Sequence, residues 1–350
     1  MSIRVEEFGS EEEWDACTGS EAEWDAFASS QKGYTHFHKL RWRTVIERVF
    51  GHQCVYLAAR DGAGKLVGIL PLVRVKSVVF GHYLVSMPFL NYGGPVGTDS
   101  AIQSLVNKAV AVARRDRVKL LELRSGVQLD TSLPVSHRKI TVVLDLPATP
   151  EALFERFPAK LRSQIRRPQK EGIKVLFGRD QLEPFFSVFA RHMRDLGTPT
   201  QSLEFFAEIA NQFPEDCWIG CAYAGEQPVA GGLGFCYSDE FEMTWASSLR
   251  DFGHKAPNML VYWAFMERAI AMGLKRFNFG RCTPGTGTHR FKMQWGGREE
   301  QLWWYALADS NGITTPSPTD KRFRWGPRIW RRLPASIATK VGPSIVRYIP

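Results

Sequence analysis

The feature that most restricts the fold of this chain is an internal repeat, because two segments about 160 residues apart carry the same order of predicted elements. In each half a helix precedes two strands joined by a tight turn, and a third strand, a loop, a second helix and a last strand follow. Residues 55–59 align with 218–222, and residues 118–124 align with 275–281. This order predicts an α+β unit, a mainly antiparallel sheet flanked by helices, that occurs twice.

The length of 350 residues is enough for two domains of ordinary size. Pro147 and Pro150 follow the first repeat and mark a boundary between the two. We therefore expect a first domain over residues 1–148, a second over 149–312 and a C-terminal tail over 313–350.

The composition is typical of a globular protein, with 44% hydrophobic and 23% charged residues. No run approaches the roughly twenty apolar residues that cross a bilayer, and Met1-Ser-Ile-Arg-Val-Glu-Glu7 lacks the pattern of a signal peptide. We therefore expect a cytoplasmic protein. The six cysteines are scattered, and even Cys217 and Cys221 lack zinc-site spacing, so we expect free, packed thiols and no metal site.

The net charge of +9 is concentrated in the tail, where residues 321–350 carry +8 and the other 320 residues carry +1. A nearly neutral body lacks the broad basic surface that binding to duplex DNA requires. The basic tail also contains apolar side chains in pieces broken by prolines: Trp325, Ile329, Trp330, Leu333, Ile337, Val341 and Ile345. Such segments either pack against the domains or lie on anionic lipid headgroups, and both interpretations stay open.

Residues 276–297 hold the densest set of candidate reactive groups. A strand with alternating phenylalanines leads into a loop whose glycines let the backbone approach a ligand. Arg281 leaves the strand and Lys292 follows the loop, so both cations could face one anionic centre. A turn with solvated cations is the alternative. Cys282 is more typical of a packed thiol than of a nucleophile.

A second basic stretch, residues 158–172, lies between the two halves. We expect a short helix that Pro168 and Gly172 end. Its cations are Lys160, Arg162, Arg166, Arg167 and Lys170. They either form an ordinary solvated face or grip a phosphate group.

With these motifs the chain resembles the FemAB family of peptidyl and aminoacyl transferases, which have two tandem GNAT-like acyltransferase domains. The resemblance covers nearly the whole chain. It rests on Arg290-Phe-Lys-Met-Gln-Trp-Gly-Gly297, on Lys160-Leu-Arg-Ser-Gln-Ile-Arg-Arg167 and on Gly93-Gly-Pro95. Residues 91–97 and 277–281 look most like the subgroup linked to bacterial exopolysaccharide and exosortase (PEP-CTERM) loci.

The resemblance implies transfer of an acyl or aminoacyl group to an amine of a cell-envelope or exopolysaccharide precursor. The implied donor is aminoacyl-tRNA, the implied acceptor is a nucleotide-linked or lipid-linked saccharide, and no cofactor is permanently bound. Lys292 falls on the family's lysine that stabilises charge at the transferred carbonyl, and we expect Arg281 to assist it as the second catalytic residue. Arg48 and Phe50 fall near a Lys-x-Trp pair that grips the acceptor's diphosphate in murein-modifying relatives. The other predicted substrate-binding residues are Tyr92, Arg162, Arg166, Phe205, Trp245, His289 and Phe291.

Three departures leave the donor and the acceptor open. Gln201 and Phe205 stand where relatives have Arg-x-x-x-Tyr, and Asn278 replaces the subgroup's usual Asp. The long helical arm with which some relatives bind tRNA has no counterpart here. An acyl-CoA donor is the neighbouring alternative, although Lys255 replaces the last small residue of the pyrophosphate loop of ordinary GNAT domains. A non-catalytic protein that binds membrane surfaces through the tail is the other alternative.

Overall fold

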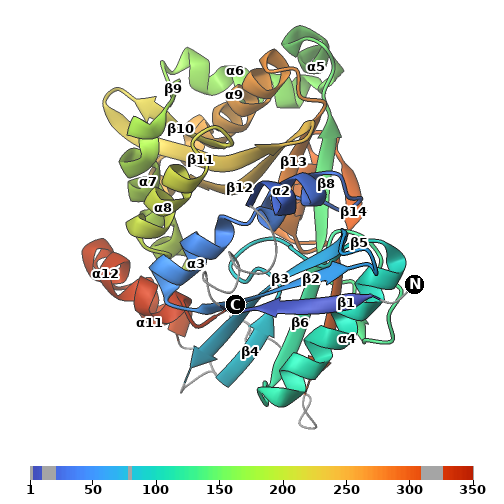
Figure 1. Ribbon diagram of the computed structural model, residues 1–350. Coiled ribbons are helices and arrows are strands. Elements are labelled where there is room, and N and C mark those ends of the chain that lie inside the picture. Colours follow the sequence, from blue (N-terminus) through green and yellow to red (C-terminus); the bar gives the residue numbers. More distant parts are fainter. Residues whose placement is uncertain (1–2, 10–20, 78–80, 309–325, 350) are drawn as a thin grey trace. The chain divides into compact units, whose positions relative to one another are not determined.

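The computed structural model of the chain describes residues 3–9, 21–77, 81–308 and 326–349. The described residues form two compact units, each with its own sheet and core (Figure 1). The first unit comprises the described residues up to 139, together with 301–308 and 347–349, and the second comprises 140–300 and 326–346. Two units of mixed sheet and helices confirm the predicted repeated α+β architecture.

The first unit is built on an eight-stranded sheet. Its strands are β1 (Arg4–Phe8), β2 (Gln53–Arg60), β3 (Leu66–Ser77), β4 (Gly81–Val85), β5 (Val96–Gly97), β6 (Leu120–Ser125), β7 (Val135–Ser136) and β15 (Trp303–Ala308). Its helices are α2 (Glu21–Ser29), the short η1 (His36–His38), α3 (Trp42–Phe50) and α4 (Asp99–Arg115). Thr98 starts α4 because its hydroxyl accepts a hydrogen bond from the backbone N–H of Ala101.

Alternation along β2 divides the core of the first unit between the two faces of the sheet. Val55 and Leu57 point into the cluster formed with the buried face of α4. Tyr56, between them, points the other way and stacks on Trp24 of α2, with ring centroids 5.4 Å apart. Both faces of β2 are therefore buried, which explains why its sequence is almost continuously apolar.

The second unit is built on a seven-stranded sheet. Its strands are β8 (Ile140–Asp145), β9 (Lys174–Phe177), β10 (Cys217–Ala224), β11 (Gln227–Tyr237), β12 (Glu240–Ser248), β13 (Arg276–Cys282) and β14 (Arg298–Gln301). Its helices are α5 (Pro150–Arg156), α6 (Ala159–Lys170), η2 (Arg179–Gln181), α7 (Leu182–Leu196), α8 (Leu203–Gln212), η3 (Arg250–Lys255), α9 (Pro257–Ala271), α10 (Gly287–Met293), α11 (Gly326–Trp330) and α12 (Ala335–Val346). Helix α9 packs against one face of the sheet, and α7 and α8 cover the other (Figure 1).

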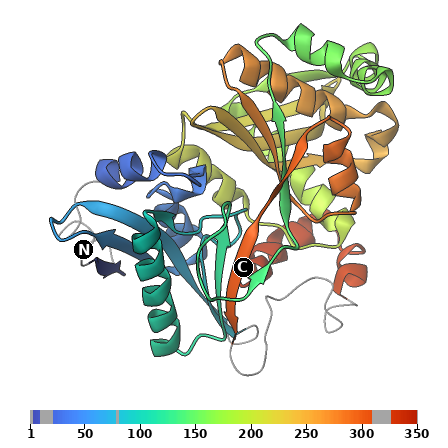
Figure 2. The ribbon, with the colours of Figure 1, turned by 90° about the vertical axis from the view of Figure 1, so that its right-hand side faces the viewer.

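The two sheets share one strand order, but each takes its sixth strand from the other half of the sequence. The order is β1-β2-β3-β4-β6-β15-β7 in the first sheet and β9-β10-β11-β12-β13-β8-β14 in the second. Strand β8 precedes the second repeat yet pairs with β13, and β15 follows that repeat yet pairs with β6. The colours of Figure 2 make this visible, since an orange strand lies in the blue-green sheet and a green strand lies among the orange ones.

This exchange moves the unit boundaries away from the expected positions after residues 148 and 312. The first unit ends at residue 139, because β8 belongs to the second sheet. The chain re-enters the first unit at residue 301, because β15 belongs to the first sheet. Local periodicity contains no information on which sheet a strand joins, so the sequence alone does not reveal this pairing.

Two local expectations need correction. Helix α6 continues through Pro168 to Lys170 instead of ending at the proline, and Gly172, with φ of +72°, ends it as expected. The predicted loop before Lys292 is shorter than expected, because α10 begins at Gly287 and Thr286 caps it through the N–H of His289.

Replacing Tyr305 by Phe tests the placement of β15 in the first sheet. The buried hydroxyl accepts a hydrogen bond from Leu129 N (2.7 Å) and donates one to Leu129 O (3.2 Å). Its loss leaves two buried backbone groups unpaired, so we expect Tyr305→Phe to lower the free energy of unfolding by about 2 kcal/mol in urea titrations. Tyr348→Phe is the matched control, and an equal effect of both variants would contradict this placement.

Candidate functional site

Each sheet contains a parallel pair of strands that separates after a few residues. In the second unit β12 and β13 pair over three residues of each strand, and the last pair is Glu242 with Asn278. Beyond it β12 continues to Ser248 and β13 to Cys282, and in the described residues no strand pairing joins them. Beyond this point the two strands therefore do not pair with each other, and their facing backbone groups need partners other than the neighbouring strand.

The first unit closes the equivalent opening with its own chain. Strands β4 and β6 pair as far as Val85 with Glu122. Beyond that pair the N–H of Arg124 donates to the hydroxyl of Ser86 (2.7 Å), and the N–H of Gly93 donates to the carbonyl of Arg124 (3.0 Å). The loop between β4 and β5 thus occupies the free edge of β6.

The predicted ligand residue Tyr92 lies in this loop. Its side chain is buried and packs against Phe37, with ring centroids 5.7 Å apart. Gly93 is required by close packing, since a Cβ there would lie 2.5 Å from the side chain of Met87. The glycines and aromatic residues of this loop are thus explained by packing that fills the first unit's opening.

In the second unit both diverging strands carry a bulge where they separate. The pairing of β12 with β11 skips Thr244, and the pairing of β13 with β8 shifts between Asn278 and Arg281. Gly280, inside the second bulge, has φ of +72°. Bulges bend strands and re-aim their side chains, and they are frequent next to active sites. The hydroxyl of Thr244 is buried and has no hydrogen-bond partner among the described residues.

Lys292 stabilises the bulge of β13 through hydrogen bonds to its backbone. Its Nζ donates to the carbonyls of Gly280 (2.6 Å) and Arg281 (3.0 Å), and the residue is only 4% exposed. The structure therefore brings the two predicted catalytic residues together. It does so through the backbone of Arg281, whereas the sequence suggested two side chains facing one anion. An ammonium group has three N–H donors, so one remains without an acceptor among the described residues.

Burial lowers the pKa of Lys292 to about 8. Cys282 and Glu242 act in the opposite direction, and Arg281 acts with the burial. Glu242, completely buried, is the last residue of β12 to pair with β13. Charged groups where β12 and β13 separate thus influence the pKa of Lys292, which lies about one unit above neutral pH.

A buried polar network surrounds this point and was not foreseen from the sequence. Asn278 donates to Glu240 (2.9 Å) and accepts hydrogen bonds from the hydroxyl of Thr141 and from the N–H of Gly280 (2.8 Å). Tyr237 donates to Glu240, whose pKa is raised by burial. Two glutamates that are two positions apart in an apolar strand lie on the same face of the sheet. The spacing of Glu240 and Glu242 is therefore the sequence feature from which this network could have been predicted.

Two other predicted residues lie on α10. His289 pairs through Nε2 with Glu299 (2.8 Å) and accepts a hydrogen bond at Nδ1 from the N–H of Gly285 (3.1 Å). Both ring nitrogens are therefore engaged. Phe291 packs edge-on against Tyr262, with ring centroids 5.0 Å apart. These contacts hold α10, and so Lys292, in place.

Of the predicted substrate-binding aromatics Phe205 and Trp245, which pack against each other, Phe205 belongs to the core and Trp245 is half-buried. Phe205 is completely buried and lies 5.7 Å from the ring of Trp245, which also contacts Phe206 and Phe235. This cluster fills the space between α7, α8 and the sheet. Phe205 therefore stabilises the fold and is not exposed to a ligand.

The cations of α6 border two hollows of different charge. A cavity of about 390 Å³ is lined by Arg162 and Arg166, but also by Glu151, Glu155 and Glu267. A second cavity of about 440 Å³ is lined by Ala159, Arg162, Ser163, Arg166, Arg167, Lys170 and Glu171. Four cations against one carboxylate make only the second cavity suitable for a phosphate group.

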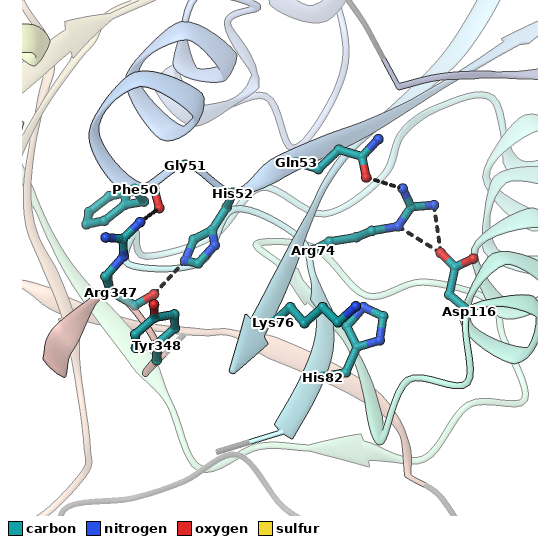
Figure 3. Close-up of a pocket in the computed structure, with 10 residues that line it drawn as sticks. All are labelled: Phe50, Gly51, His52, Gln53, Arg74, Lys76, His82, Asp116, Arg347 and Tyr348. Atoms are coloured by element: carbon teal, nitrogen blue, oxygen red, sulfur yellow. Dashed lines mark hydrogen bonds and ion pairs between the residues drawn. The ribbon is translucent and has the colours of Figure 1, made fainter. Parts of the chain in front are cut away.

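A further cavity of about 530 Å³ lies in the first unit and contains the predicted residue Phe50 (Figure 3). Arg48 is exposed on the same helix but is not among the lining residues. Arg74 is held there by Asp116 (2.6 Å) and Gln53 (2.7 Å). The lining consists of Phe50, Gly51, His52, Gln53, Arg74, Lys76, His82, Asp116, Arg347 and Tyr348. Burial lowers the pKa of both histidines, which favours their neutral forms.

The described residues contain neither a cluster of metal ligands nor a helix that could span a membrane. No group of three or more His, Cys, Asp or Glu is placed there to hold a metal ion. The described cysteines are free, and burial raises the pKa of Cys221 to about 12. Among the described helices, none combines the length and the apolarity needed to cross a bilayer.

The second unit matches a known family model. Residues 156–293 match the model described as an acetyltransferase (GNAT) domain. The UDP-N-acetylmuramoylpentapeptide-lysine N(6)-alanyltransferase of Weissella viridescens is 24% identical over 135 residues, which cover 36% of this chain and 40% of that protein. Both descriptions denote acyl transferases, in agreement with the predicted class of enzyme.

Solved structures extend the likeness over most of the chain. The crystal structure of FemX has a TM-score of 0.65 at 15% identity, covering 86% of this chain and 97% of FemX. L-PGS from Bacillus licheniformis has a TM-score of 0.54 at 11% identity, covering 90% of this chain and 97% of that structure. At these identities the likeness establishes the fold.

Fold and site together define a protein with two tandem GNAT-like units. The GNAT-domain match, the alanyltransferase relative and the fold of FemX support the resemblance to the FemAB family found in the motifs. The exopolysaccharide-associated subgroup stays a prediction.

The burial of Lys292 predicts a pH-dependent stability. The folded pKa is about 8 against an ordinary value of 10.5, so between these pH values the unfolded chain binds the additional proton and native stability rises with pH. The variant Lys292→Met has no titratable group at this position, so its stability lacks this pH dependence. The unfolding free energy of the native protein should therefore rise relative to that of the variant by roughly 3 kcal/mol across the window, measured by urea titration. Lys65→Met, at an exposed turn, should show no such change, and a flat difference for Lys292→Met would contradict the burial.

The polar network predicts that Asn278→Asp is destabilising and that the effect depends on pH. A second carboxylate would stand opposite Glu240 at the position where the amide now donates. Two buried carboxylates retain a proton in the folded state, so stability should fall as pH rises from about 5 to about 8, by roughly 2 kcal/mol relative to the native protein. Thermal unfolding at both pH values measures this, with the exposed Asn107→Asp as control. Equal losses at both values would exclude the proposed contact.

Proposed function

We propose that this protein is an acyl or aminoacyl transferase that forms an amide on an amine of a cell-envelope precursor. One observation carries the proposal: β12 and β13 separate beyond Glu242 and Asn278, and Lys292 is fixed at the edge of the separated strand. Diverging parallel strands leave backbone groups that polar groups of a bound donor can hydrogen-bond. The matches to a GNAT domain and to an alanyltransferase support the same chemistry.

The proposed reaction is nucleophilic attack by the acceptor amine on the carbonyl carbon of the donor. A C–N bond forms and the C–O bond of an ester or the C–S bond of a thioester breaks. The amine loses a proton to solvent or a weak base, and the departing oxygen or sulfur takes up a proton from the same source and leaves as a hydroxyl or a thiol. The remaining N–H of Lys292 and the side chain of Arg281 stabilise the oxyanion. A preorganised ammonium in a dry site contributes more than one in water, because the surrounding dielectric constant is low.

The reaction is assigned to the second unit, since the first fills its own opening with Ser86 and Gly93. Phosphate groups of the donor or acceptor are assigned to the cationic cavity beside α6, through Arg162 and Arg166. Phe50 and the cations near it in the first unit are a second candidate for acceptor phosphates.

The donor is proposed to be aminoacyl-tRNA, as the resemblance to the FemAB family implies, or acyl-CoA, the alternative left open by the sequence. The acceptor is proposed to be a nucleotide-linked or lipid-linked saccharide, either a murein precursor or an exopolysaccharide precursor. A cytoplasmic location at the inner face of the membrane suits such an acceptor.

Purified protein incubated with labelled alanyl-tRNA or acetyl-CoA and UDP-N-acetylmuramoyl-pentapeptide tests the proposal by mass spectrometry of the product. With the preferred donor, we expect Lys292→Met to lower kcat roughly 100-fold with little change in KM, because the lysine acts on the transition state. The native rate should decline as pH rises through about 8, where the ammonium loses its proton. Lys65→Met is the matched control. An unchanged kcat in Lys292→Met would exclude the catalytic role of Lys292.

A further inference from the structure

Exposed aliphatic side chains gather at the C-terminal end of the second unit. Ile329 of α11 and Ile337 and Val341 of α12 are 61%, 47% and 43% exposed, and Leu196 at the end of α7 is 41% exposed. On α12, Ile337, Val341 and Lys340 share one face, since residues three and four apart are neighbours on a helix. We call these side chains, together with Arg328 and Arg332, the α11–α12 surface. Trp325 lies outside the described residues.

The opposite sides of the same helices are already packed. Trp330 and Ala338 are buried, and at Gly342 an added Cβ would come within 2.9 Å of the backbone N of Thr200. Nη2 of Arg331 donates to the carbonyl of Leu196 (3.1 Å), and Nη1 of Arg194 donates to that of Leu333 (3.2 Å). The sequence left open whether the tail packs or binds a membrane. Within the second unit, one side packs while the aliphatic side stays exposed.

All charged side chains that the C-terminal segment contributes to this surface are positive. Arg328, Arg332 and Lys340 are exposed, and residues 321–350 contain no Asp or Glu. Asp195 at the end of α7 pairs with Arg194 at 2.7 Å, so its charge is compensated. Exposed aliphatics ringed by cations match the interface of an anionic bilayer, where headgroups attract the cations and the acyl boundary accepts the aliphatics.

We propose that the α11–α12 surface binds anionic phospholipid headgroups and inserts its aliphatic side chains into the interface. Nucleic acid is the competing partner for a cationic surface, but binding to single-stranded RNA uses aromatic stacking. Trp330 of this segment is buried and the exposed apolar side chains are aliphatic. Short helices separated by Pro334 are suited to lying in the plane of an interface. The inference goes beyond the proposed transfer reaction, because it holds whichever donor and acceptor are used.

Flotation of the full-length protein with vesicles tests this proposal. We expect binding to vesicles of phosphatidylcholine with phosphatidylglycerol, little binding to phosphatidylcholine alone, and a decrease with added salt. The double variants Ile337→Ser with Val341→Ser, and Arg332→Glu with Lys340→Glu, should each weaken binding roughly tenfold or more. The changed side chains are exposed, so circular dichroism and melting should remain native.

Met272→Ser and Lys65→Glu are the matched controls, because Met272 is a more exposed aliphatic and Lys65 an exposed cation, both outside the α11–α12 surface. They should bind vesicles like the native protein. Loss on charge reversal but not on removal of the aliphatics, together with competition by tRNA, would identify a nucleic-acid surface and overturn the proposal. Unchanged binding in both double variants would overturn it as well. Neither outcome bears on turnover, so failure of this proposal is distinguishable from failure of the transferase assay.

Discussion

Backbone hydrogen bonding at a diverging parallel pair is the constraint on which both units depend. Two strands that separate leave N–H and C=O groups that need other partners, because unpaired buried backbone groups are costly. The first unit supplies Ser86 and Gly93 to the edge of β6. The second bulges β13 at Gly280 and covers two of its carbonyls with Lys292. The same fold therefore yields one unit whose diverging strands are bridged by its own loop and one whose bulged strand is held by Lys292.

The burial of Lys292 follows from this arrangement. A charged amine is expensive to bury unless it is hydrogen-bonded and near opposite charge, and here two carbonyls and Glu242 provide both. The pKa of about 8 shows that these interactions only partly offset the desolvation. With this pKa the amine of Lys292 is mostly protonated at neutral pH. Because it is shielded from water, its electrostatic effect on a nearby group is stronger than that of a solvated ammonium.

The sequence predicts local structure well where one periodic pattern suffices. The second helix predicted in each half is present as α4 and α9. The exchange of β8 and β15 is not predictable in this way, because it depends on pairing between residues far apart in sequence. Motif similarity selected Lys292 and Arg281, which the structure brings together through the backbone of Arg281. It also selected Phe205 and Tyr92, which are buried, since an aromatic that binds a ligand and one that fills a core have the same local pattern.

The strand exchange also couples the folding of two otherwise separate cores. The first sheet lacks the strand between β6 and β7 until residues 303–308 have been synthesised, by which time the whole second sheet is available. Contacts of such large sequence separation form late, because closing a long loop costs entropy before the contacts repay it. The first unit therefore cannot complete its core ahead of the second, although it comes first in the chain. Strand β8, at the start of the second unit, likewise pairs only with strands that are synthesised much later. One of them is β13, whose bulge is stabilised by Lys292. Completion of the first sheet and assembly of the proposed active site thus require the same nearly full-length chain.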